Sequence, residues 1–219
     1  MIKIATTVLF FTAAANADFV VVNNPVIDTV GFYSDAFSSN GAYTYAQSGA
    51  QGFDLEDTYT TSSIKWWGSM NGFNGQGLSN ISGFDIVIWS PSFDEQVISQ
   101  SMSMDYVSIA KTGDYNFFGQ PVYEFTVQFT QLLSAGSYYM NIGASLNDVG
   151  GDQFVWSQGQ AVNDFWFTDD NGQYNWGDWR KLPNTFVGNT AGGAFVMTAP
   201  APGVVALLGL AGLVAKRRR

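Results

Sequence analysis

The sequence predicts an all-β protein, an antiparallel β-sandwich, and three observations support this prediction. The 219-residue chain is rich in the Phe, Tyr, Trp, Thr, Val, Ser, Gly and Asn residues that suit strands and turns, and its body is poor in the Leu, Lys, Glu and Arg that cover helix surfaces. Apolar and polar residues alternate in several short stretches. Clusters of turn-forming residues separate these stretches, and short strands spaced in this way are typical of a sandwich.

Five stretches with a period of two residues predict individual strands, because successive side chains of a strand point to opposite faces. In residues 83–89, Phe84, Ile86 and Ile88 share one face. In residues 122–129, one face is polar and exposed to solvent while the other is apolar and buried. The adjacent Trp66 and Trp67 must also point in opposite directions, so we expect one ring in the core and one on the far face. The stretches cover residues 63–68, 83–89, 104–110, 122–129 and 138–143.

Turn chemistry separates these predicted strands. Residues 71–77, 147–152 and 169–172 combine Gly with Asn, Asp or Gln. Glycine tolerates positive φ, and Asn and Asp side chains bond to nearby backbone, so these segments are expected to be turns.

The N-terminus has the three regions of a secretory signal peptide. Lys3 supplies a positive charge, residues 4–14 form an apolar segment, and Ala15 and Ala17 provide the small residues of an A-x-A cleavage site. We therefore expect a signal helix that signal peptidase removes before Asp18, and a protein that is exported.

The C-terminus has the features of a membrane stop. Residues 204–215 are apolar on all sides, and Lys216, Arg217, Arg218 and Arg219 follow them. Basic residues resist translocation and keep such a tail on the cytoplasmic side. Because the apolar run is shorter than the roughly 20 residues of a permanent span, we expect a short hydrophobic helix that tethers the chain to the inner membrane transiently. The alternative is a short helix within a soluble domain.

The two ends together resemble those of PEP-CTERM proteins. The resemblance is carried by the signal peptide, by Pro200-Ala201-Pro202-Gly203, by the apolar segment and by the terminal arginines. Pro-Ala-Pro stands where the family has Pro-Glu-Pro. The resemblance implies a Gram-negative bacterium, recognition of this tail by an exosortase-type sorting protease, and delivery to the cell surface or extracellular matrix. It divides the chain into a signal peptide (1–17), a body (18–198) and a sorting signal (199–219).

The body resembles a recurring type of exported protein within the same family. The resemblance covers residues 53–156 and is carried by the stretches 65–68 (Lys-Trp-Trp-Gly), 84–89, 133–138 (Leu-x-x-Gly-x-Tyr) and 154–157. It implies a jelly-roll-like β-sandwich, similar in outline to carbohydrate-binding modules. It names an architecture and no ligand.

Charge restricts the partners of the body. All 18 acidic residues lie in residues 18–178, and only Lys65, Lys111, Arg180 and Lys181 are basic in the body (18–198), so 4 minus 18 leaves a net charge of −14. Carboxylates repel phosphate and release no counterions, so we expect no nucleic-acid binding and contact with the membrane through the C-terminal segment alone. The chain has no Cys, so no disulfide can stabilise the fold.

Composition also argues against catalysis. Without His or Cys, Ser-His-Asp triads, Cys-His dyads and zinc sites with the usual ligands are excluded, and no phosphate-binding or dinucleotide-binding motif is present. Two carboxylates suffice for glycoside hydrolysis. However, the adjacent acidic pairs at 56–57, 94–95 and 169–170 lie in turn-like polar surroundings. We therefore expect no catalytic residue and no enzyme activity.

Residues 163–180 concentrate aromatic rings with acid and amide groups. In one interpretation Tyr174, Trp176 and Trp179 stand on a loop at residues 168–180 and stack on sugar rings, while neighbouring oxygens accept hydrogen bonds from the sugar hydroxyls. The alternative is structural, with Phe165 and either Phe167 or Trp166 alternating into the core and the two later tryptophans capping the sandwich edge. The same segment could hold a structural Ca²⁺ ion through Asp169 and Asn171, although the full EF-hand pattern is absent. No other cofactor is expected.

Two functions follow from these observations. The first is a non-catalytic structural or adhesive β-sandwich of the cell surface or extracellular matrix. The alternative is a secreted carbohydrate-binding module with a polysaccharide as its partner, and a glycosidase ranks well behind both.

Overall fold

The computed structural model describes residues 18–24, 26–39, 42–72, 75–116, 118–148, 152–159, 164–170, 176–181 and 192–200. In these ranges the chain forms strands and two short 3-10 helices, and it forms no α-helix there. The prediction of an all-β chain with antiparallel sheets is therefore confirmed. Both predicted terminal helices lie outside the described residues. Across the described ranges no helix has the length and apolar character needed to cross a membrane.

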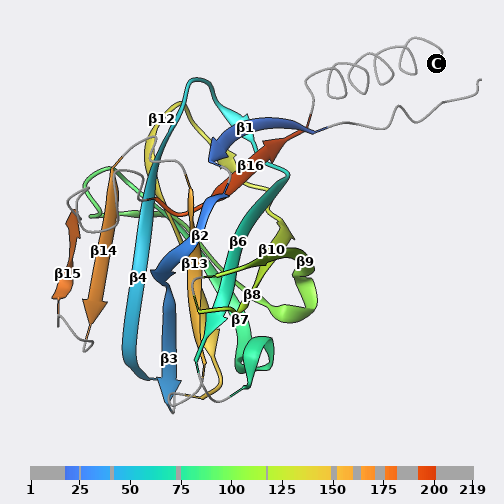
Figure 1. Cartoon of the computed structure of the whole chain (residues 1–219). Helices are drawn as coiled ribbons and strands as arrows, with labels where there is room; N and C mark the ends of the chain where they lie inside the picture. The colour runs from blue at the N-terminus through green and yellow to red at the C-terminus, as the bar shows by residue number, and fades with distance from the viewer. Residues whose placement is uncertain are drawn as a thin grey trace, which may run out of the picture.

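The first of two seven-stranded sheets is built around the central strand β6 (Figure 1). Strand β10 pairs with one side of β6, whereas residues 63–66 and 68–71 of its other side pair with β16 and β13 in turn. Strands β1, β9 and β2 complete the sheet beyond β16, β10 and β13. The strands are β1 (Phe19–Asn24), β2 (Val26–Tyr33), β6 (Ser63–Asn71), β9 (Ser108–Tyr115), β10 (Pro121–Gln128), β13 (Gln153–Gly159) and β16 (Phe195–Ala199).

The second sheet has the strand order β15-β14-β4-β3-β12-β7-β8. Residues 136–141 of β12 pair with β4, and residues 144–146 pair in parallel with β3, which is inserted between the two longer strands. The strands are β3 (Asp35–Ser39), β4 (Ala42–Leu55), β7 (Ile81–Trp89), β8 (Gln96–Ser103), β12 (Gly136–Leu146), β14 (Phe165–Asp170) and β15 (Trp176–Lys181). A small ribbon pairs β5 (Tyr59–Thr60) with β11 (Leu132–Leu133), and the 3-10 helices are η1 (Gly77–Asn80) and η2 (Met104–Tyr106).

Four of the five predicted strands coincide with β6, β7, β10 and β12, but the stretch 104–110 does not form one strand. Residues 104–106 form η2, and β9 begins only at Ser108. The Ser103 hydroxyl accepts a hydrogen bond from the backbone N–H of Asp105 at 3.3 Å, which favours a helical turn over continued extension. At this turn the chain passes from the second sheet to the first.

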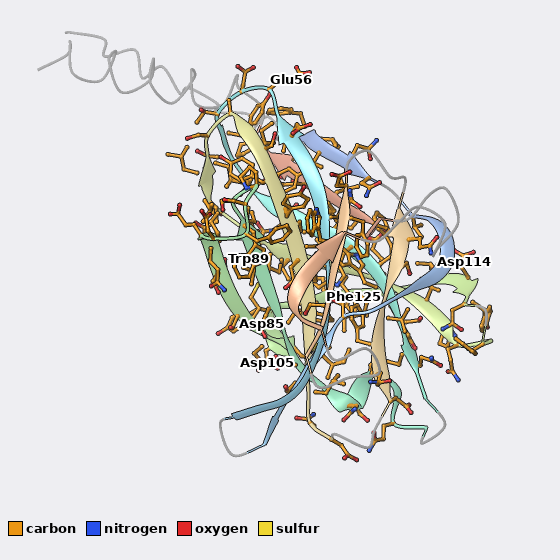
Figure 2. The ribbon with its side chains drawn as sticks, turned by 90° about the vertical axis from the view of Figure 1, so that its left-hand side faces the viewer. Glu56, Asp85, Trp89, Asp105, Asp114 and Phe125 are labelled. Atoms are coloured by element: carbon orange, nitrogen blue, oxygen red, sulfur yellow. The ribbon has the colours of Figure 1, made fainter. Side chains whose placement is uncertain are left out.

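An aromatic core joins the two sheets. Trp66, Phe125 and Phe154 come from the first sheet and Phe84 from the second, and all four are at most 1% exposed. The ring centroid of Phe84 lies 5.0 Å from Trp66, 5.1 Å from Phe125 and 5.2 Å from Phe154. Figure 2 shows Phe125 inside the molecule. Trp67 is half-buried, so one ring of the pair lies in the core and the other faces away from it, as predicted.

A glycine after the tryptophan pair allows this core to close. A Cβ atom on Gly68 would lie 2.4 Å from the ring of Phe154 and 2.8 Å from the carbonyl oxygen of Val155. Because β13 lies this close to β6, a larger residue at position 68 would force the strands apart.

The two ends of the described chain meet in one place. Strands β1 and β16 are antiparallel, with Phe19 opposite Ala199. Ser62 Oγ donates to the Asp18 carboxylate at 2.6 Å and lies 2.8 Å from Thr198 Oγ1, which in turn lies 2.8 Å from Ser63 Oγ. We call Asp18, Ser62, Ser63 and Thr198 the terminal clasp.

Candidate functional site

Most described residues of the segment 163–180, which was expected to carry the sugar site, lie in strands. Asp169 lies in β14 and Trp176 and Trp179 lie in β15, and the two strands pair with Asp169 opposite Trp176. The sequence suggested that the sugar-binding rings stand on a loop at residues 168–180 and that residues 169–172 form a turn. Both predictions are corrected in part, because cross-strand pairing extends through residues 168–170 and 176–181. Asn171 and Tyr174 lie outside the described residues.

Buried and outward-facing rings alternate at the start of β14, as expected if this segment has a structural role. Phe165 is 4% exposed and packs toward Gly49 of β4, where an added Cβ would lie 2.5 Å from its ring. Trp166 is half-buried and points to the opposite face of the sheet, which is turned away from the core. The aromatic residues at the start of β14 thus lie on both faces of the sheet, Phe165 on the core face and Trp166 on the outward face.

Trp166 belongs to a group of four half-buried rings on this outward face, with Trp89, Phe93 and Tyr139. Phe93 lies at the centre, with its ring centroid 4.5 Å from Tyr139, 5.3 Å from Trp166 and 6.1 Å from Trp89. Tyr139 and Trp166 also meet edge to face at 6.2 Å. We call these four residues the outer aromatic cluster.

Strand register brings the cluster together. Trp89 of β7 lies directly opposite Tyr139 of β12, and their chain neighbours Ile88 and Met140 are fully buried on the core face. Phe93 reaches the cluster from the turn between β7 and β8, where it has a positive φ of 60°. That conformation is unfavourable for a bulky residue, so the packing of its ring must compensate for the backbone cost.

A polar turn borders the cluster. Ser90 Oγ and Ser92 Oγ donate to Asp94 Oδ1 at 2.7 and 2.5 Å, and the backbone N–H of Glu95 donates to Ser90 Oγ at 3.3 Å. The hydroxyl of Ser92, followed by that of Ser90, lowers the pKa of the Asp94 carboxyl, because both bonds stabilise its charged form. Asp94 and Glu95 are exposed and can accept hydrogen bonds from a ligand.

This arrangement has the chemistry of a binding surface. Aromatic rings offer apolar faces, and the adjacent carboxylates accept hydrogen bonds from hydroxyl groups. A general acid in glycoside hydrolysis needs a raised pKa, and the shift at Asp94 has the opposite direction. Within the described part of the chain no three Asp or Glu residues gather as a metal site would require.

The sequence contained a signal for half of the cluster. Period-two phasing puts Trp89 and Tyr139 on the faces opposite Ile88 and Met140, so two aromatic residues on a non-core face could have been noticed. No local pattern predicts that Phe93, from a turn, would join them. The residues of the two predicted export signals, including Ala15, Ala17, Pro202, Gly203 and the terminal arginines, lie outside the described ranges, whereas Pro200 follows β16 directly.

Comparison with models of known protein families and with curated proteins found no match.

Proposed function

We propose that the protein is an exported, non-catalytic β-sandwich of the jelly-roll type that acts at the cell surface or in the extracellular matrix. The observation that carries this proposal is the antiparallel pairing of the first described strand, β1, with the last, β16. Strand β1 starts at Phe19, one residue after the proposed signal peptidase site, and β16 ends at Ala199, directly before Pro200. The two proposed signals are therefore attached next to a pair of neighbouring strands.

The pairing of β1 with β16 supports removal of both signals. Phe19 lies opposite Ala199, and the terminal clasp ties Asp18 to Thr198 through Ser62. Both signals thus join the body at one end, as a chain held transiently at one membrane requires. After cleavage before Asp18 and within the tail, every strand and the aromatic core would keep their contacts.

Intact-mass measurement of protein from the native host tests this proposal. The mature protein is expected to begin at Asp18 and to lack residues 216–219. An Ala17→Arg variant should keep its signal peptide, because signal peptidase needs a small residue there, while Asn16→Ser should be processed normally. Recovery of the full chain from residue 1 to residue 219 would overturn the export proposal.

The outer aromatic cluster favours a second function, the binding of a polysaccharide. Sugar rings present apolar faces that stack on aromatic side chains, and their hydroxyls need acceptors such as those of Asp94 and Glu95. Trp176 and Trp179 belong to the strand next to β14, so they extend the same sheet beyond Trp166. A structural Ca²⁺ ion at Asp169 and Asn171 is a further part of this proposal.

Sedimentation with insoluble polysaccharides tests the second function. Trp166→Ala and Trp176→Ala are each expected to weaken retention about tenfold, since loss of an aromatic anchor typically costs more than about 1 kcal/mol. Tyr106→Ala is the matched control, because Tyr106 is 76% exposed and lies outside the cluster. Equal retention of all three variants would reject the cluster as a glycan site and leave the export proposal intact.

A further inference from the structure

Strand β8 is an edge strand of the second sheet. In the described part of the chain it pairs only with β7, and its pairing is regular from Ile98 to Ser103. Residues 96–103 read Gln-Val-Ile-Ser-Gln-Ser-Met-Ser, with no charge, proline or glycine. Such an edge exposes a row of backbone donors and acceptors to any strand that approaches.

The other sheet edges carry protective devices. Strand β9 contains Lys111 and a bulge at Gly113, whose φ is 94°. Strand β2 contains Asp28 and two register shifts, β1 contains one register shift, and β15 contains Arg180 and pairs irregularly. Charges and bulges on an edge oppose pairing with another chain. Their absence from Ile98 to Ser103 distinguishes β8.

Among the described residues, the inner face of the first sheet is partly exposed on the same side of the molecule. Strands β8 and β9 are the ends of their sheets and are joined by η2 and Val107, so both edges lie on one side. Ile109 of β9 lies opposite Phe125 of β10 and shares its inward direction, yet Ile109 is 40% exposed while Phe125 is 0% exposed. One more strand beside β8 would extend the second sheet beneath this residue.

We propose that β8 of a second copy of this chain supplies that strand, paired antiparallel about a two-fold axis at Ser99. This register places Val97 opposite Ser101 of the second copy and Ile98 opposite Gln100, so apolar and neutral polar residues meet on both faces. It also places Glu95 opposite Ser103. A register centred on Gln100 would instead place Glu95 opposite Asp105, and like charges directly opposite are unfavourable.

A chain without cysteine allows a direct test by disulfide trapping. In the full chain, held in a non-ionic detergent, Ser99→Cys is expected to form disulfide-linked dimers under mild oxidation, because paired Cα atoms lie about 4.5–5.5 Å apart. Ser103→Cys is the control within β8, since its two copies would lie about 27 Å apart at about 3.4 Å per residue. Ser108→Cys is the control on β9, the other edge. All three serines are exposed.

The proposal predicts at least a tenfold excess of cross-linked dimer at position 99 over positions 103 and 108. A Ser99→Lys variant, which places two ammonium groups together at the axis, should shift sedimentation of the otherwise unaltered chain toward the monomer. Circular dichroism identical to that of the unaltered chain would show that the variant is folded. Equal cross-linking at positions 99 and 103, or no dimer at position 99, would overturn the proposal.

Discussion

Two glycines show how strongly single residues determine the closeness of this packing. Gly68 lies against Phe154 and the backbone of β13, whereas the nearest atom to an added Cβ on Gly143 is the carbonyl oxygen of Ser34 at 3.9 Å. Neither glycine has a positive φ. The two positions therefore differ in the space available and share ordinary strand conformation.

Gly68→Ala is expected to lower the free energy of unfolding by about 1–3 kcal/mol, because overpacking forces the facing strand to move. Gly143→Ala should be neutral or slightly stabilising, since alanine restricts the unfolded chain more than glycine does. Urea unfolding followed by tryptophan fluorescence measures both. Equal midpoints for the two variants would contradict the contact described at Gly68.

The polar turn beside the outer aromatic cluster makes a prediction about pH. The hydroxyls of Ser92 and Ser90 lower the pKa of Asp94 in the folded protein, so their stabilising effect is present above the unfolded pKa and is lost as pH falls through the folded value. NMR titration of the Asp94 carboxyl should give a pKa below 3.8, the ordinary value of an aspartate side chain. In the Ser90→Ala, Ser92→Ala double variant the midpoint should return toward that value, and an unchanged midpoint would contradict the assignment.

At the scale of strands, the sequence predicted local conformation better than it predicted boundaries. Alternation identified β6, β7, β10 and β12, because each carries one face into the aromatic core. It failed at residues 104–106, where the Ser103 hydroxyl accepts a hydrogen bond from the backbone N–H of Asp105 and the chain crosses between sheets, which together favour a 3-10 turn. The turn-forming residues near position 170 also predicted a loop there, although long-range pairing with β4 holds residues 168–170 in a strand.

The terminal clasp is expected to stabilise the pairing of the first and last described strands, β1 and β16. Thr198→Val removes the hydroxyl that lies 2.8 Å from both Ser62 and Ser63, and it is expected to cost about 1–2 kcal/mol because two partners lose a hydrogen bond. Thr60→Val, on an exposed site of β5, is the control and should change stability little. Hydrogen exchange should then rise first in β1, and exchange that rises uniformly would argue against a local role.

The outer aromatic cluster depends on the whole molecule and therefore escaped prediction. Its four rings come from β7, β12, β14 and a turn, and sequence separations of up to 77 positions divide them. Only the strand order β14-β4-β3-β12-β7 brings these elements to one face. Periodicity gives the direction of a side chain along its own strand, but it gives no neighbour across a sheet.

The net charge of the body affects the stability of the whole fold. With a net charge of −14 on residues 18–198, repulsion among carboxylates opposes the compact state. The Debye length falls from about 30 Å at 0.01 M salt to about 8 Å at 0.15 M, so NaCl should screen this repulsion and stabilise the fold. We expect a gain of about 1 kcal/mol, or about 2–4 °C in Tm, in calorimetry of the full chain.

CaCl₂ at matched ionic strength is the control, because an extra rise in Tm would indicate a specific calcium site such as Asp169 and Asn171. A Tm that falls with NaCl would mean that attractive ion pairs such as Lys65 with Glu124, at 3.0 Å, outweigh the repulsion.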